Sequence, residues 1–123
     1  MGYLIVFLGG GLGAALRHGV NLAAARLFGT GFPAGTLTVN VAGSIAMGML
    51  AAWFAFKGGA TQHWRLFLTT GVLGGFTTFS SFSLDVAVLY ERGAFGMTAA
   101  YVLLSLVLSV AGLFAGLALV RGI

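Results

Sequence analysis

The sequence predicts an all-α integral membrane protein, with four transmembrane helices in a single domain that covers residues 1–123. Hydrophobic residues make up 59% of the chain and charged residues only 7%, and the mean hydropathy is +1.07. A soluble domain carries charge on about a quarter of its residues, so this composition excludes one. A bilayer core of about 30 Å takes about 20 helical residues per span. Four such spans use nearly the whole chain and leave no soluble domain that could house an enzyme.

The spans are expected at residues 3–28, 33–56, 64–90 and 94–120, with short polar connections between them. The first span lacks the basic region and the cleavage site of a signal peptide, so it is expected to be a transmembrane helix. Pro33 suits the first turn of the second span, because the missing N–H of proline is harmless there. The chain is therefore expected to cross the cell membrane, inner or plasma, several times.

The third span is expected to break near its middle, at residues 74–78. From Gly71 to Ser83 the sequence reads GVLGGFTTFSSFS, with three glycines and two adjacent threonines where an unbroken apolar helix carries Leu, Ile or Ala. Backbone groups released from a helix are costly in lipid, so such a break persists only where it lines a cavity or holds an ion.

The basic residues are distributed almost evenly between the two sides of the membrane. With four spans, Lys57, Arg65 and Arg121 fall on the side of both termini, and Arg26 and Arg92 fall on the opposite side. Positive charge normally sets the orientation of a membrane protein. A near balance therefore predicts insertion in both orientations, and pairing of opposed copies into an antiparallel dual-topology homodimer. The alternative is that such short loops make the charge count uninformative.

Asn40 lies about seven residues into the second span and shares a helix face with Thr36, Gly43 and Met47. An asparagine in a membrane helix often hydrogen-bonds a neighbouring helix, and this structural role stays open. The amide also has two donor hydrogens, which an anion stripped of its water can accept. Asn40 is therefore a candidate either for packing or for anion binding.

A row of hydroxyls follows one face of the fourth span. Tyr101, Ser105 and Ser109 lie four residues apart, and Gly112 and Gly116 continue the same face. Small residues at this spacing also let helices approach closely, and a serine can bond the carbonyl four residues back, so a packing role stays open. Packing alone predicts no tyrosine on this face. Tyr101 therefore favours a polar track that ions can follow.

Phe79 and Phe82 are three residues apart and face the same way once the third span resumes its helix after the break. Phenylalanine rings are usually core or lipid contacts, and the chain has 11 of them. The ring edge, however, is the positive part of the ring quadrupole. Rings presented edge-on can stabilise a small anion weakly, as conduction requires.

Three motifs together are similar to those of a known family. They are G-x-x-x-G-A-x-x-R from Gly9 to Arg17, GTLTVN from Gly35 to Asn40, and GVLGGFTTFSSFS from Gly71 to Ser83. In this order, and over essentially the whole chain, they resemble the Fluc family of small fluoride channels, also called CrcB proteins. The resemblance implies an antiparallel dual-topology homodimer with two pores. Such a dimer lets cytoplasmic fluoride leak out passively and so relieves fluoride toxicity in microbes.

The resemblance also implies roles for particular residues. Phe79 and Phe82, contributed by opposite subunits, would line each pore. The backbone carbonyls of Gly74 and Thr77 in both subunits would hold one structural Na⁺ at the dimer axis. Arg17 would either lie beside an aqueous vestibule or brace the dimer through a carbonyl or phosphate. The implied fluoride pathway comprises Asn40, Phe79, Phe82, Tyr101, Ser105, Ser109, Thr36 and Ser81.

Two other functions stay open. A dual-topology proton-coupled exporter of organic cations needs a carboxylate in the middle of the membrane. The acids here, Asp85 and Glu91, lie towards the end of the third span, where Asp85 is expected to cap the interface or pair with Arg92. A small assembly subunit of a larger membrane complex would use the Asn and Ser faces for docking. His18 and His63 lack metal-ligand spacing, and no nucleic-acid partner is expected.

Overall fold

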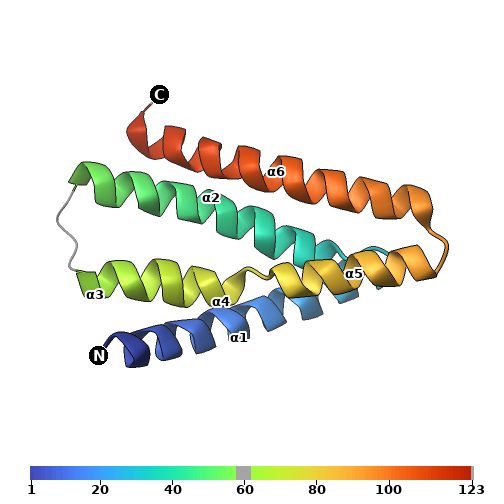
Figure 1. The fold of residues 1–123 in the computed structure, drawn as a ribbon, viewed down its shortest axis with the longest axis horizontal. Helices are drawn as coiled ribbons and strands as arrows, with labels where there is room; N and C mark the ends of the chain where they lie inside the picture. Colours follow the sequence, from blue (N-terminus) through green and yellow to red (C-terminus); the bar gives the residue numbers. More distant parts are fainter. Residues whose placement is uncertain (58–61, 123) are drawn as a thin grey trace.

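The residues that the computed structural model describes, 1–57 and 62–122, form helices joined by short connections (Figure 1). Three of the spans are single helices, namely α1 (Gly2–Phe28), α2 (Ala34–Lys57) and α6 (Phe95–Arg121). The third span runs from Gln62 to Glu91 in several pieces. Within the described residues, 4 helical spans are long and apolar enough to cross a membrane. The predicted number of spans is confirmed. The helix ends lie within about two residues of the expected bounds, a usual uncertainty for helix boundaries.

The break in the third span is shorter than predicted. Thr77 (φ −86°, ψ 157°) and Thr78 (φ −154°, ψ 118°) are extended, whereas Gly74–Phe76 is still helical. Threonine suits this conformation because β-branched side chains favour extended backbone. The helices before and after the break are α3 (Gln62–Arg65), η1 (Leu66–Leu73), α4 (Gly74–Phe76) and α5 (Phe79–Glu91).

The first half of the third span is not a regular α-helix. η1 is a π-helix of 8 residues, a rare conformation that is often found at functional sites. It leads directly into α4 and the break. This form was not predicted, because the mostly apolar segment LFLTTGVL has no periodicity that distinguishes a π-helix from an α-helix.

The helices form two pairs that diverge towards the end of the molecule that carries both termini (Figure 1). α2 packs along α6, and α1 packs along η1 and α4. At the opposite end, Arg92 Nη2 donates a hydrogen bond to the Gly31 carbonyl at 2.8 Å. The arrangement places Arg26 and Arg92 at one end and Arg65 and Arg121 at the other, as the span count predicted.

Glycines let the backbones of both pairs approach closely. A Cβ added to Gly9 would lie 3.0 Å from Gly71 Cα, and one added to Gly75 would overlap a carbonyl of α1. In the other pair, a Cβ added to Gly116 would overlap the Ile45 carbonyl. Small residues commonly pair membrane helices in this way, because lipid provides no hydrophobic force between them. The packing role that the sequence left open for Gly116 is therefore confirmed.

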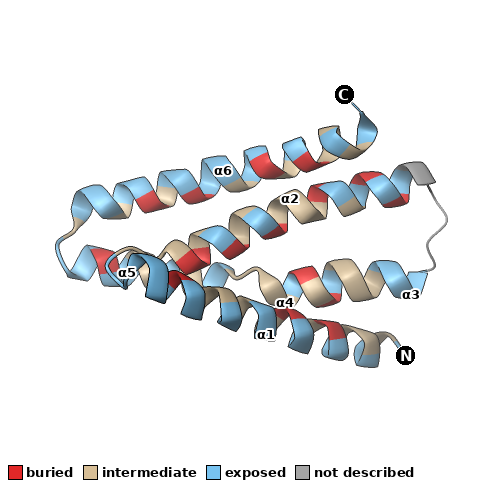
Figure 2. Cartoon of the chain, turned by 180° about the vertical axis from the view of Figure 1, so that it is seen from behind, coloured by how far each residue is buried: buried red, intermediate tan, exposed pale blue. Residues whose placement is uncertain are grey.

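The outer faces of the helices are apolar and exposed. Figure 2 shows the buried positions as short stretches between exposed ones along the long helices α1, α2 and α6. Large side chains such as Phe7 and Phe114 are mostly exposed, as a lipid-facing surface requires, whereas Val39, Leu89 and Tyr101 are buried between helices. The chain is a multi-pass membrane protein. Its interior contains a set of polar groups near the break.

Candidate functional site

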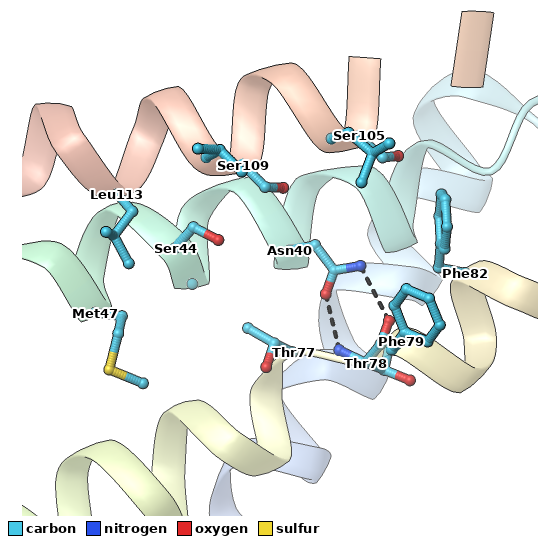
Figure 3. Close-up of a pocket in the computed structure, with 13 residues that line it drawn as sticks. Asn40, Ser44, Met47, Thr77, Thr78, Phe79, Phe82, Ser105, Ser109 and Leu113 are labelled. Atoms are coloured by element: carbon cyan, nitrogen blue, oxygen red, sulfur yellow. Dashed lines mark hydrogen bonds between the residues drawn. The ribbon is translucent and has the colours of Figure 1, made fainter. Parts of the chain in front are cut away.

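Asn40 of α2 holds the break from one side. Asn40 Nδ2 donates to the Thr78 carbonyl at 3.0 Å, and Thr78 N donates to Asn40 Oδ1 at 2.8 Å (Figure 3). The side-chain amide pairs with this extended residue as a neighbouring strand would, and it satisfies two backbone groups that lipid cannot. One of the two Nδ2 hydrogens remains for another acceptor. The structural role that the sequence left open for Asn40 is therefore present, and it fixes the orientation of the remaining donor.

The backbone amides that follow the break are redirected to side chains. Thr78 Oγ1 caps α5 by accepting from Ser81 N at 3.2 Å, and Thr78 N bonds Asn40. In an unbroken α-helix these two amides would bond the carbonyls four residues earlier, those of Gly74 and Thr77. These two oxygens, which the family resemblance assigned to a cation, are therefore among those whose helical donors are lost at the break, although Gly74 itself remains helical.

Arg17 of α1 holds the break from the opposite side. Arg17 Nε donates to the Gly75 carbonyl at 3.1 Å. An arginine inside a membrane span is costly unless it finds a partner, and a carbonyl near the break provides one. Arg17 thus contacts a carbonyl of its own chain, and the vestibule and dimer roles expected for it stay predictions.

A pocket of about 310 Å³ opens beside Asn40, between α2, α6 and the break (Figure 3). Phe79 and Phe82 reach it from the first turn of α5, and Ser105 and Ser109 reach it from α6. Spacings of three and four residues put both members of each pair on one helix face. The structure thus brings these predicted pathway residues together around one space.

The hydroxyls of Ser105 and Ser109 are buried, and neither has a hydrogen-bond partner within the described residues. Elsewhere on α6 a hydroxyl is satisfied locally, because Thr98 Oγ1 donates to the Ala94 carbonyl at 2.7 Å. The two serines therefore do not bond the carbonyls four residues back, which was one alternative from the sequence. A buried polar group without a partner costs about 1–3 kcal/mol. These two hydroxyls are suited to a polar ligand in the pocket.

The aromatic rings at the pocket contact one another and leave one wall open. The centroids of Phe79 and Phe82 are 5.5 Å apart at 45°, and Phe82 lies 5.2 Å from Tyr101 at 41°. Tilted rings present their positive edges as well as their faces. Phe79 is nevertheless 74% exposed. A single chain therefore encloses the pocket incompletely at this ring.

Tyr101, Thr36 and Ser81 are not among the residues that line the pocket. Tyr101 is fully buried beside Phe82, and its hydroxyl donates to Asp85 Oδ2 at 3.0 Å. Thr36 is also buried, and Ser81 contributes its backbone amide to the cap of α5. The predicted polar track therefore reaches the pocket through its serines, while the Tyr101 proton is committed to a carboxylate.

The expected pairing of Asp85 with Arg92 is not what the structure shows. Asp85 accepts from Tyr101, and the Arg92 guanidinium donates to the Gly31 carbonyl in the connection before α2. Spacing along the chain put Asp85 and Arg92 two turns apart on one helix, but the contact from another helix is the one that forms. The acid therefore lies against α6, beside Tyr101.

The family model described as "CrcB-like protein, Camphor Resistance (CrcB)" matches residues 4–117. The chain belongs to this CrcB-like family. A curated relative from Rhodopseudomonas palustris (strain BisB5), "Fluoride-specific ion channel FluC", is 63% identical over 123 residues, which cover 100% of this chain and 99% of the relative. The resemblance that the three motifs carried is confirmed.

Two further curated relatives are similar to the chain over nearly its whole length. One from Nitrobacter hamburgensis, "Fluoride-specific ion channel FluC 2", is 64% identical and covers 98% of this chain and 98% of its own length. One from Methylobacterium nodulans, "Fluoride-specific ion channel FluC", is also 64% identical and covers 96% of this chain and 94% of its own length. Similarity to CrcB-like proteins therefore extends through every span.

The sequence-based prediction for this CrcB-like chain omitted Ser44. This residue lines the pocket one turn beyond Asn40 on α2, and Met47 and Leu113 lie further along the same space (Figure 3). The signal was available, because Ser44 follows Asn40 by four residues and so shares its helix face. A hydroxyl next to a glycine on a packed helix had an obvious packing interpretation, which hid its place in the pocket.

Proposed function

We propose that this CrcB-like protein is a channel through which cytoplasmic fluoride leaves the cell passively, which relieves fluoride toxicity. One observation carries the proposal: the buried hydroxyls of Ser105 and Ser109 have no partner among the described residues, in a pocket shared with Asn40. Hydroxyl and amide donors suit an anion that has shed its water. The curated relatives are named fluoride-specific ion channels, which supports fluoride as that anion and agrees with the expectation that the chain is not an enzyme.

In this proposal the pocket replaces the water shell of fluoride. The Nδ2 hydrogen of Asn40 that the break leaves free and the hydroxyls of Ser105 and Ser109 donate to the anion, and the edges of Phe79 and Phe82 add a weak positive potential. Because α5 begins at the break, the positive end of its dipole also lies at the pocket. Several weak contacts let an ion enter and leave.

The channel is proposed to act as an antiparallel dual-topology homodimer with two pores. Phe79 lines the pocket and is 74% exposed, so in a single chain one wall faces lipid, where fluoride finds no donor. A second copy in the opposite orientation closes that wall, with Phe79 of one subunit and Phe82 of the other at the same pore. The near balance of basic residues at the two ends supports insertion in both orientations.

One structural Na⁺ is proposed to bind the carbonyls of Gly74 and Thr77 of both subunits at the dimer axis. The amides that would bond these oxygens in a helix donate to Asn40 and Thr78 instead, so the oxygens need another partner in lipid. Neutral carbonyls are suitable ligands for a hard cation, and the bound cation supplies positive charge that stabilises the break. Replacing Na⁺ by a much larger cation during purification should weaken the dimer; an unchanged dimer would count against this site.

A proton-coupled exporter has less support than a channel. Exchange of protons for cations needs an ionisable carboxylate where the substrate binds. Asp85 accepts a hydrogen bond from Tyr101 and is not among the residues that line the pocket. An assembly subunit, the other alternative, gives no reason for the buried hydroxyls that have no partner in the described part of the chain.

Purified protein in liposomes tests the proposal. Fluoride should leave down its own gradient without a pH gradient. Asn40→Asp keeps an acceptor for Thr78 N but removes the donors and adds negative charge, so efflux should fall below detection. The matched control is Ser83→Ala, because Ser83 Oγ bonds the Phe79 carbonyl and does not line the pocket; it should conduct like the wild type. Absent efflux from the wild type, or full efflux from Asn40→Asp, would refute the proposed channel.

A further inference from the structure

We propose that the fluoride path continues past Asn40 to a second anion site formed by Ser44 and Ser109, and that Met47 and Leu113 close the pocket beyond it. This inference rests on the proposed function. It adds to that function a residue, Ser44, and an apolar closure that the three motifs did not assign.

The pocket is much larger than one ion needs. Its volume of about 310 Å³ compares with about 30 Å³ for one water in the liquid, and fluoride is similar to water in size. Along α2 the lining runs from Asn40 through Ser44 to Met47, a distance of about 10 Å at 1.5 Å per helical residue. An ion bound at Asn40 therefore leaves most of the pocket, including the part around Ser44, still to cross.

Ser44 and Ser109 offer donors in that remaining part. Figure 3 shows both side chains turned into the pocket, with Ser109 between Asn40 and Ser44 along its length. The close packing of α2 against α6 keeps the two helices in a fixed register. Ser109 Oγ is buried without a partner among the described residues. A hydroxyl on each helix can therefore donate to the same anion.

The pocket ends at apolar side chains. Met47 and Leu113 lie beyond Ser44 and carry no donor that fluoride can use (Figure 3). Apolar constrictions restrict ions by excluding water. Ser44 is thus the last donor on α2 before the closure, and an ion held there is positioned to leave when the methionine side chain moves, which its three rotatable bonds permit.

Fluoride conductance in planar bilayers, measured over a range of fluoride concentrations, tests the second site. Ser44→Ala should lower the conductance about fivefold and raise the half-saturating fluoride concentration, the effect of losing one hydrogen bond to the ion. Ser44→Thr keeps the hydroxyl and should restore most of the conductance. Ser83→Ala is the control, since its hydroxyl bonds the Phe79 carbonyl, and it should match the wild type.

Wild-type conductance and saturation in Ser44→Ala, together with an inactive Asn40→Asp, would overturn the second site and leave the channel intact. A wild type that carries no fluoride would refute the proposed function itself, and this inference with it. Met47→Ala tests the proposed closure and removes no hydrogen-bond donor. This test can be made even if the Ser44→Ala protein does not fold. It should raise the conductance, and an unchanged or lower value would overturn the closure.

Discussion

The two sides of the break differ in how completely their polar groups are satisfied. On the α1 side, Arg17 bonds the Gly75 carbonyl, and glycines bring the backbones into contact. On the side of α2 and α6, Asn40 bonds the break, but Ser105 and Ser109 keep buried hydroxyls without partners among the described residues. The first side uses its polar groups for structure, and the second side keeps donors available. Mutations on the two sides should therefore affect stability and conduction differently.

The largest effect is expected on the α1 side, from Gly13→Leu. A Cβ at Gly13 would overlap the Val72 carbonyl, a backbone atom that cannot move without disturbing η1. Overpacking commonly costs about 1–3 kcal/mol, and backbone overlap should exceed that, so little folded protein should elute on size exclusion in detergent. Gly11→Leu is the matched control, because a Cβ there meets nothing within 4 Å. Equal yields of the two variants would show that the close approach is unimportant.

Arg17→Met should affect the stability of the protein more than its ion selectivity. It leaves the Gly75 carbonyl without the donor at 3.1 Å, which should reduce the free energy of unfolding by about 1–3 kcal/mol. Thermal unfolding followed by circular dichroism measures this loss. Arg26→Met, at the exposed end of the same helix, should unfold like the wild type. A stable Arg17→Met protein would remove Arg17 from the structural side of the comparison.

Ser105→Ala should lower fluoride efflux without lowering stability, the reverse of what is expected for Arg17→Met. Fluoride efflux from liposomes should fall about tenfold for the loss of one donor to the ion. Stability should stay the same or rise, because the variant removes a buried hydroxyl that has no partner among the described residues. A lower melting temperature with normal efflux would place Ser105 among the structural residues instead.

The smallest effect on efflux is expected from Tyr101→Phe. Its hydroxyl donates to Asp85 and not into the pocket, so the variant should lose about 1 kcal/mol of stability and little efflux. Combining it with Asp85→Asn in a double-mutant cycle would measure the coupling of the pair. An efflux loss as large as that of Ser105→Ala would mean that the tyrosine hydroxyl donates to fluoride after all.

Most of the fold could be predicted because it depends on long apolar runs. Those runs gave four spans, and the adjacent glycines and threonines gave the position of the break. The π-helical form of η1 could not be predicted, since neighbouring glycines on α1 and not its own periodicity accommodate it. The pair of hydrogen bonds between Asn40 and Thr78 could not be predicted from the sequence either. Spacing shows which helix face a residue occupies but not which backbone it contacts.

The sequence predicted the position of some residues of the candidate site better than that of others. Motif resemblance identified Asn40, the two phenylalanines and the serines of α6, and the structure brings them to one pocket. It did not separate Tyr101 from them, because Tyr101 shares their helix face and only the position of α5 commits its hydroxyl to Asp85. The dimer, the two pores and the sodium site remain predictions.

The order of the chain has a consequence for how the protein enters the membrane. Arg17 and Asn40, which bond the break at Gly75 and Thr78, both precede it in the sequence. Chains are synthesised from the N-terminus, so α1 and α2 can already be in the bilayer when the third span follows. The polar backbone of the break then meets waiting partners and not lipid alone. The Gly75 carbonyl and the backbone N–H and carbonyl of Thr78 can thus be bonded as soon as the third span is inserted.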